Sequence, residues 1–296
     1  MEPLSESMFE RDFSKTVRRL IPEQTQDKIA MFLFVFLLPA IFFGVFFMVL
    51  PTWYPVYGEA WMLRVVPILF LLASMYFNWV QMIRVGPNGI NTALPMTYQA
   101  GFVFCHHCKM NAPPRSHHCP VCDVCIFRRD HHCSFAAVCV GHHNQKYFCA
   151  AIVQLFLAVF PAFAWTWVWM WSELGPAHLG RFWHLVMPHV ALALRFVSVR
   201  EFSYIGMCGL VFTVLLFNSY LISAQIFCFW RGQTRVEYLQ DISAYNLGFM
   251  ENIRQSLGSR WYLLGLFPWI PSPLESNGLS YKTRPAAKFS HSAKEM

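Results

Sequence analysis

Residues 105–139 read CHHCKMNAPPRSHHCPVCDVCIFRRDHHCSFAAVC, and this stretch holds seven of the chain's ten cysteines. One spacing, C-x2-C-x9-H-x6-C, occurs twice in it, and the second copy begins 14 residues after the first. The first quartet is Cys105, Cys108, His118 and Cys125, and the second is Cys119, Cys122, His132 and Cys139. Three thiolates and one imidazole are the donors of a closed tetrahedral zinc site. The pattern therefore predicts two structural Zn2+ ions.

The two quartets interleave along the chain, so we expect the loop to fold as one knot around both metals. So short a segment cannot bury a core of its own, and metal binding would supply its folding free energy. A RING-type ubiquitin ligase also interleaves two zinc sites, but it requires C-x-H-x2-C in its middle. Here His118 directly precedes Cys119, which disfavours the RING interpretation. Chance clustering of Cys and His is the remaining alternative, and the repeated spacing argues against it.

One cysteine of the cluster, Cys133, belongs to neither quartet. It follows Asp130, His131 and His132, and only His132 is assigned to a zinc ion. A thiol beside a free imidazole that a carboxylate can orient is the arrangement nucleophilic catalysis needs. The residues therefore favour Cys133 as nucleophile, His131 as base and Asp130 as the orienting group. A buried thiol without a chemical role is the alternative.

The composition is that of a membrane protein, with 56% of residues hydrophobic, 17% aromatic and only 13% charged. An average soluble domain is about a quarter charged, so a disordered chain, a coiled coil and most soluble enzymes are excluded. The net charge of +7 does not indicate nucleic-acid binding. The basic residues are kept apart from the apolar blocks of the chain. Of the 23 Lys and Arg, 19 fall in residues 1–28, 84–146 and 231–296.

Four apolar blocks are long enough to cross a bilayer, which takes about 20 residues. They run over Ile29–Leu50, Val65–Ile83, Tyr147–Trp171 and Ile205–Phe229. Four polar residues inside them, expected to face other helices rather than lipid, are Asn78, Gln154, Asn218 and Gln225. The sequence predicts an all-α polytopic membrane protein of four transmembrane helices, with the cysteine-rich two-zinc domain between the second and third. A large soluble helical core is the weaker alternative.

A fifth segment, Phe182–Val199, is apolar but contains Arg195 and Pro188. A charge at mid-depth costs roughly 2.5 to 3.5 kcal/mol, so we expect this segment to be interfacial or re-entrant. Four spans place both termini and the cysteine-rich loop on one side, which the basic residues identify as the cytosol. The predicted domains are a cytosolic N-terminal segment (1–28), helices 1 and 2 (29–83), the cysteine-rich domain (84–146), helices 3 and 4 with a luminal loop (147–230) and a cytosolic C-terminal tail (231–296).

Asp130-His131-His132-Cys133 inside such a loop resembles the DHHC palmitoyltransferases, membrane enzymes that attach fatty acids to cysteines. The resemblance covers most of the chain, and the tail from Arg231 to Pro273 is similar to that of a divergent mammalian member. The other matching motifs are Pro113-Pro114-Arg115-Ser116-His117-His118-Cys119; Cys139-Val140-Gly141 leading to Asn144 and Phe148; Gly232-Gln233-Thr234-Arg235-Val236-Glu237, where the family has Thr-Thr-x-Glu; and Tyr245-Asn246-Leu247-Gly248 with Asn252.

The resemblance implies a two-step reaction with acyl-CoA, usually palmitoyl-CoA, as co-substrate. Cys133 would attack the thioester, with His131 taking the proton and Asp130 holding the imidazole. A cysteine of a membrane-associated protein would then take the acyl group. In the family the two zinc ions are structural and leave the nucleophile unligated, and the enzymes lie in Golgi or ER membranes. Four basic residues that could meet CoA phosphates or lipid headgroups, or simply be solvated charges, are Arg115, Arg128, Arg129 and Lys146.

The chain departs from the family at three places. Ser134-Phe135 follows the nucleophile where most members have Pro-Trp, and Ala137-Val138 replaces an Asn pair. Arg235 replaces the second Thr of Thr-Thr-x-Glu, which in the family contacts the motif aspartate. We expect the Arg235 side chain to pair with Asp130, or alternatively with lipid phosphates.

These departures leave a second function open, a zinc-containing membrane scaffold of the same architecture with little activity. The intact Asp130, His131 and Cys133 favour the enzyme. A channel or transporter is set aside, because the spans lack intramembrane ionisable pairs and inverted repeats.

Overall fold

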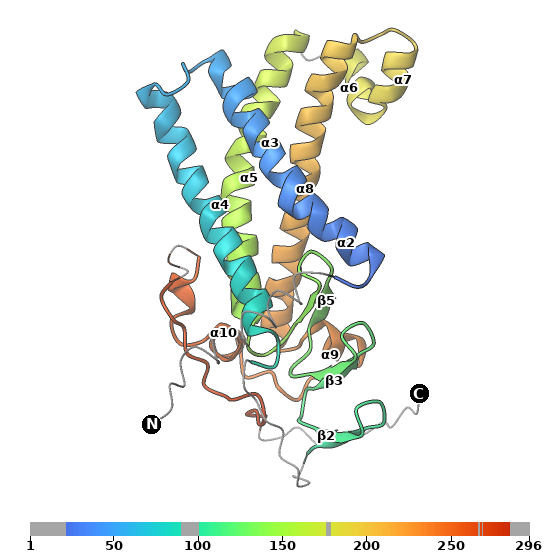
Figure 1. The fold of residues 1–296 in the computed structure, drawn as a ribbon, viewed down its shortest axis with the longest axis vertical. Coiled ribbons are helices and arrows are strands. Elements are labelled where there is room, and N and C mark those ends of the chain that lie inside the picture. The colour runs from blue at the N-terminus through green and yellow to red at the C-terminus, as the bar shows by residue number, and fades with distance from the viewer. Residues whose placement is uncertain (1–21, 90–100, 176–178, 266, 268, 285–296) are drawn as a thin grey trace, which may run out of the picture. The chain divides into compact units, whose positions relative to one another are not determined.

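The computed structural model describes residues 22–89, 101–175, 179–265, 267 and 269–284. In this part of the chain four helices are long and apolar enough to cross a membrane (Figure 1): Thr25–Thr52, α4 (Glu59–Val85), α5 (Gln145–Leu174) and α8 (Val199–Arg231). Each contains one predicted apolar block and extends beyond it. The prediction of four transmembrane helices is confirmed, and the described chain is mostly helical, with six short strands that the all-α prediction did not include. Of the expected terminal segments, residues 1–21 and 285–296 lie outside the described residues.

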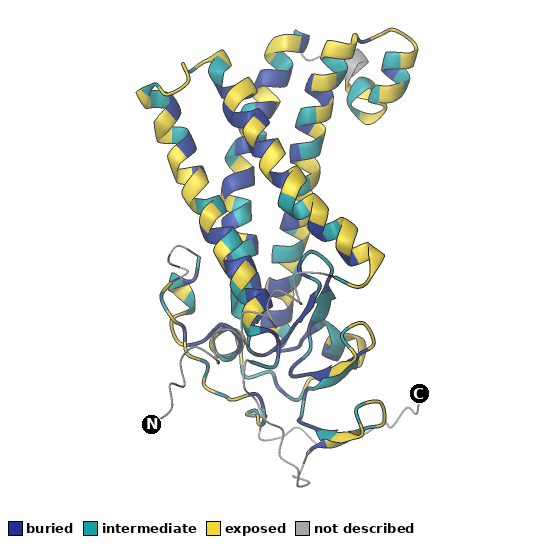
Figure 2. Cartoon of the chain, in the orientation of Figure 1, coloured by how far each residue is buried: buried dark blue, intermediate teal, exposed yellow. Residues whose placement is uncertain are grey.

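The first span is built from several helical pieces. It consists of α2 (Thr25–Phe32), a π-helical turn (Leu33–Leu37), α3 (Leu38–Gly44), a second π-helical turn (Val45–Val49) and a 3-10 turn (Leu50–Thr52). All four spans carry large apolar side chains that are more than half exposed (Figure 2), among them Phe36, Leu63, Phe160 and Ile226. Exposed apolar surface of this extent needs a lipid environment.

Four polar residues of the spans lie away from that apolar surface. Asn78, Gln154, Asn218 and Gln225 are all buried, as predicted. The Asn218 side chain donates a 2.9 Å hydrogen bond to the Ile152 carbonyl of another helix.

The described residues between α5 and α8 form no helix long enough to cross a membrane. It forms two short helices, α6 (Leu179–Val186) and α7 (Pro188–Ala193), which are separated at Met187. Pro188 begins α7 because proline disfavours helical geometry in the residue before it. Neither helix approaches the length of a span. The expectation that this segment is interfacial or re-entrant stays a prediction.

The chain divides into two compact units. The first unit comprises Met1–Met31, Tyr76–Ala151 and Ser223–Met296, and the second comprises Phe32–Met75 and Ile152–Ile222. The second unit has a buried core around Trp169, Met170 and Tyr204. The cysteine-rich loop and the described part of the tail both belong to the first unit, so the candidate site is described within that unit.

The cysteine-rich loop forms three antiparallel hairpins of three-residue strands. They are β1 (Val103–Cys105) with β2 (Met110–Ala112), β3 (His117–Cys119) with β4 (Val124–Ile126), and β5 (His131–Cys133) with β6 (Val138–Val140). Each hairpin starts 14 residues after the previous one, and each has a left-handed residue at its tip: Lys109, Asp123 and Ala137. These strands have no signature in the sequence, because three residues are too few for an alternating pattern.

The tail folds back onto this loop through a buried ion pair. Glu237, in α9 (Arg235–Leu239), accepts two hydrogen bonds from the Arg115 guanidinium, at 2.6 and 2.7 Å. Glu237 also completes a capping box with Thr234 at the start of α9. Tyr245 and Tyr281 lie over the guanidinium, with ring centroids at 4.3 and 5.1 Å. The pair thus joins the loop to the segment that follows α8.

The rest of the described tail contains α10 (Phe249–Leu257) and a 3-10 turn (Trp261–Leu263), followed by an irregular segment. That segment is held by side chains of the loop and of α5. Lys146 donates to the Ser272 carbonyl and His142 bonds to the Ser276 carbonyl, both at 2.9 Å.

Replacing Glu237 tests this buried pair. Glu237→Ala leaves the Arg115 guanidinium buried without a partner, which should lower the free energy of unfolding by about 3 to 5 kcal/mol. Thermal unfolding of the detergent-solubilised protein measures the change. Glu275→Ala, which removes an exposed partner of Lys282, is the matched control and should change little. Equal unfolding temperatures for the two variants would contradict the assignment.

Candidate metal centres and active site

The structure assembles both predicted quartets. In each, the four ligand atoms lie within 4.8 Å of one another. In the second quartet, Nδ1 of His132 lies 3.4 Å from Cys122 Sγ and 3.7 Å from Cys139 Sγ, and the two sulfurs are 3.7 Å apart. Tetrahedral zinc with bonds of about 2.3 Å to sulfur places sulfurs about 3.8 Å apart. The donor set and its spacing therefore fit two metal ions, as expected of zinc.

The hairpins explain how the quartets form. Each quartet takes two cysteines from the tip of one hairpin and a cross-strand His and Cys pair from the next. The first quartet joins the tip at Cys105 and Cys108 to the pair His118 and Cys125. The second joins the tip at Cys119 and Cys122 to the pair His132 and Cys139.

The third tip carries the nucleophile candidate. With the same 14-residue offset, Cys133 occupies the place of Cys105 and Cys119, and Ala136 occupies the place of the second tip cysteine. Ala136 is fully buried and has no metal-binding atom. Cys133 is therefore left out of both quartets by the repeat itself.

Strand alternation places the neighbouring residues. In β5, His131 and Cys133 share one face and His132 points to the other, which separates the base from the metal ligand. His131 Nδ1 lies 2.8 Å from Asp130 Oδ2, and its side chain also interacts with the Cys133 thiol. The three predicted catalytic residues are thus brought together, in the order thiol, imidazole, carboxylate.

The site lowers the pKa of Asp130 and raises the pKa of His131. Burial by itself would raise the pKa of Asp130, but hydrogen bonds from His131, from the Arg235 backbone and from Gln225 lower it to about 2. Burial would lower the pKa of His131, but the interactions with Asp130 and Cys133 raise it to about 9. The ionised carboxylate therefore makes the imidazole a stronger base toward the adjacent thiol.

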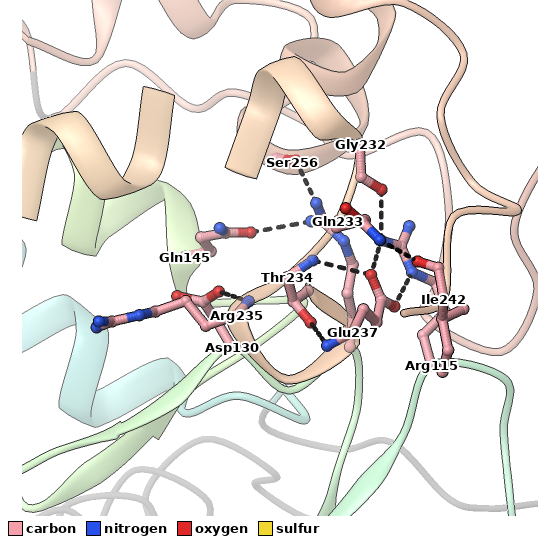
Figure 3. Close-up of polar contacts among 11 residues, drawn as sticks. Arg115, Asp130, Gln145, Gly232, Gln233, Thr234, Arg235, Glu237, Ile242 and Ser256 are labelled. Atoms are coloured by element: carbon pink, nitrogen blue, oxygen red, sulfur yellow. Dashed lines mark hydrogen bonds and ion pairs between the residues drawn. The ribbon is translucent and has the colours of Figure 1, made fainter. Parts of the chain in front are cut away.

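Arg235 contacts Asp130 through its backbone N–H. The prediction that the Arg235 side chain pairs with Asp130 is therefore wrong. The Arg235 N–H donates a 2.9 Å hydrogen bond to Asp130 Oδ1, and its guanidinium extends away from the Arg115–Glu237 pair (Figure 3). The first residue of a helix has a free N–H that points outward, and Arg235 is the first residue of α9. This contact does not depend on the identity of the side chain.

A chain of side-chain hydrogen bonds reaches the other oxygen of Asp130. Arg128 Nη1 donates to Gln145 Oε1, Gln145 Nε2 to Gln225 Oε1, and Gln225 Nε2 to Asp130 Oδ2, each at 2.9 Å. Arg128 also donates to the Ser256 hydroxyl of α10 (Figure 3). Burial lowers the pKa of Arg128 to about 10, so it stays cationic near neutral pH and polarises the chain toward the carboxylate.

Sequence reasoning missed most of this chain of bonds. Gln225 was expected only to face another helix, and Gln145 and Ser256 carried no signal. A polar residue inside an apolar span is the one available hint.

The four basic residues differ in exposure. Arg115 and Arg128 are buried, and their guanidinium groups bind protein partners. Arg129 and Lys146 are partly exposed, and each donates to a backbone carbonyl, of His118 and Ser272 respectively.

The chain is similar in sequence to proteins named as palmitoyltransferases. A family model described as DHHC palmitoyltransferase matches residues 99–242. The rat protein named "Probable palmitoyltransferase ZDHHC24" (Rattus norvegicus) is 34% identical over 200 residues, which cover 62% of this chain and 65% of the relative. The protein of that name from Danio rerio is 31% identical over 218 residues, covering 72% and 73%. The chain thus spans just under two thirds of the rat relative's length.

The human protein of the same name (Homo sapiens) is 33% identical over 208 residues, which cover 65% of this chain and 68% of the relative. Similarity of this extent, together with the family model, shows that this chain belongs to the DHHC palmitoyltransferase family.

Proposed function

We propose that the chain is a protein S-palmitoyltransferase that forms an acyl-enzyme at Cys133. The observation that carries the proposal is the third hairpin, in which Cys133 stands outside both quartets and beside an imidazole held by a buried carboxylate. A thiol in this setting is an activated nucleophile. Membership of the DHHC palmitoyltransferase family supports the acyl donor and the acceptor class.

The reaction would run in two transfers. In the first, the Cys133 sulfur attacks the thioester carbonyl of a long-chain acyl-CoA while His131 holds the thiol proton. The bond from carbonyl carbon to CoA sulfur breaks, and CoA leaves with the proton from His131. In the second, a protein cysteine gives its thiol proton to His131, and its sulfur attacks the carbonyl carbon of the acyl-enzyme. The bond from that carbon to the Cys133 sulfur breaks, and Cys133 leaves with the proton from His131. Asp130 keeps the imidazole oriented through both transfers.

The two zinc ions would be structural. Four protein ligands close each site, so neither ion has an open position for substrate, and metal binding supplies folding free energy to the loop. Arg129 and Lys146, which are partly exposed, are the residues we propose for the CoA phosphates. The distribution of basic residues supports cytosolic termini and a cytosolic loop. We also propose that the enzyme lies in Golgi or ER membranes and that its substrates are membrane-associated proteins. The domain boundaries named above are part of the same proposal.

Metal analysis tests the two quartets. Purified, folded protein should contain two zinc ions per chain, and Cys105→Ala or Cys119→Ala should unfold the loop, because each removes a thiolate from a site that supplies folding energy. Elemental analysis and limited proteolysis of the loop measure both effects. One zinc ion or none in folded protein would exclude the assignment.

Replacement of the nucleophile tests the reaction. Cys133→Ser should abolish acyl-enzyme formation from a fluorescent long-chain acyl-CoA, because a hydroxyl is far less acidic than a thiol. Both zinc ions and the unfolding temperature should be unchanged. Cys208→Ser, which alters a buried cysteine in α8, is the matched control and should acylate normally. Loss of zinc in Cys133→Ser would instead make Cys133 a ligand.

The Arg235 N–H can be removed without altering the helix. Proline is tolerated at the first position of a helix, and Thr234 is already extended, with φ −82° and ψ 169°, as a residue before proline requires. Arg235→Pro should therefore slow acylation about tenfold or more, because a hydrogen bond to a charged group contributes about 1.5 to 3 kcal/mol. Arg235→Ala and Arg235→Thr, which keep the N–H, should acylate at the parent rate. Equal rates for Pro and Ala would refute the role of this donor.

The 14-residue repeat of the hairpins predicts that Ala136, in place of a second tip cysteine, keeps Cys133 available as a nucleophile. Ala136→Cys recreates a C-x2-C tip with Cys133, as in the first two hairpins, and should draw the Cys133 thiol into a disulfide. Acyl-enzyme formation should be lost, whereas Ala136→Ser should retain it. Zinc content and acylation of both variants are the measurements, and an Ala136→Cys protein that acylates at the parent rate would contradict the equivalence of the three tips.

A further inference from the structure

The second quartet has a partner outside the cysteine-rich loop. Asp27 lies in the first turn of α2 and is 3% exposed. Its Oδ2 lies 3.0 Å from Nε2 of His132, a residue 105 positions later in the chain. Both residues belong to the first unit.

The two nitrogens of His132 have separate roles. Nδ1 faces the sulfurs of the quartet, at 3.4 Å from Cys122 and 3.7 Å from Cys139. A metal-bound imidazole is neutral and carries its single proton on the other nitrogen. Nε2 therefore donates to Asp27, and the carboxylate fixes which nitrogen is turned toward the metal.

We propose that Asp27 is a positioning residue for the second metal ion, which it holds through His132. A carboxylate behind a ligating imidazole orients the ring and raises its basicity, and losing such a group typically costs 10- to 100-fold in metal affinity. Asp27 itself gains from the contact, because a buried carboxylate without a donor is strongly disfavoured. The inference rests on the proposal that the quartets hold zinc.

The first quartet offers a comparison within the same chain. There His118 Nε2 faces Asp123 Oδ1 at 3.7 Å, and the Asp123 side chain is 93% exposed. That distance exceeds a hydrogen bond, and Asp123 belongs to the tip of the same hairpin. Among the described residues, the two proposed metal ions therefore differ in support: the second is tied through His132 to the start of a membrane-spanning helix, and the first has no such tie.

The contact between Asp27 and His132 also affects the candidate active site. His132 lies in β5 directly before Cys133. Asp27 thus links the start of the first span to the strand that carries the nucleophile, and loosening it should disturb that strand before the rest of the loop.

Zinc release measures the proposed role without relying on activity. Full-length protein in detergent is mixed with a chromogenic zinc chelator, and the release of each ion is followed for the parent, Asp27→Asn, Asp27→Ala and Asp123→Asn. We expect Asp27→Asn to release one of the two ions about tenfold faster and the other at the parent rate. Asp123→Asn should match the parent for both ions.

The outcomes separate the inference from the proposal on which it rests. Parent protein that holds no zinc would overturn the zinc assignment and this inference with it. Parent protein with two zinc ions and an Asp27→Asn variant that releases both at the parent rates would overturn the role of Asp27 alone. Equal acceleration of both ions in Asp27→Asn would also overturn it. If Asp27→Ala fails to fold, the isosteric Asn variant still decides.

Discussion

Each candidate metal joins the tip of one hairpin to the middle of the next, and the geometry of the site depends on that link. Strands of three residues cannot hold a sheet by backbone pairing alone, so the metals would supply most of the loop's stability. Once His132 is fixed in the second quartet, strand alternation puts His131 and Cys133 on the opposite face of β5. The placement of the proposed catalytic pair thus follows from that of the candidate metal site beside it.

The second constraint is the charge of Asp130. A buried carboxylate must be supplied with donors, and here they come from β5, from the start of α9 and from Gln225 in α8. The Arg235 donor is a backbone N–H, so the departure from the family's Thr leaves the contact in place. At the Ser134-Phe135 departure the contact is again made by the backbone. The Trp79 side chain donates a hydrogen bond to the backbone carbonyl of Phe135 at 3.0 Å. Neither backbone contact depends on the identity of the side chain at its position.

Much of the fold and of the site could be predicted from the sequence, because the signals are strong and local. Apolar blocks of span length predicted the four membrane helices, and the repeated C-x2-C-x9-H-x6-C spacing predicted both quartets and the spare thiol. The side-chain pairing of Arg235 was wrong, because spacing cannot distinguish a backbone donor from a side-chain donor. The Asp27 contact to His132 spans 105 residues, and no pattern in the sequence links positions so far apart.

The central claim is that the third hairpin tip presents a thiol that no metal holds. Peptide mapping by mass spectrometry, after zinc-loaded full-length protein is incubated with palmitoyl-CoA, tests it most directly. The account predicts one acyl group per chain, on the peptide that carries Cys133, in a thioester cleaved by hydroxylamine. An acyl group on Cys149, or on any cysteine of the two quartets, with Cys133 unmodified, would contradict it.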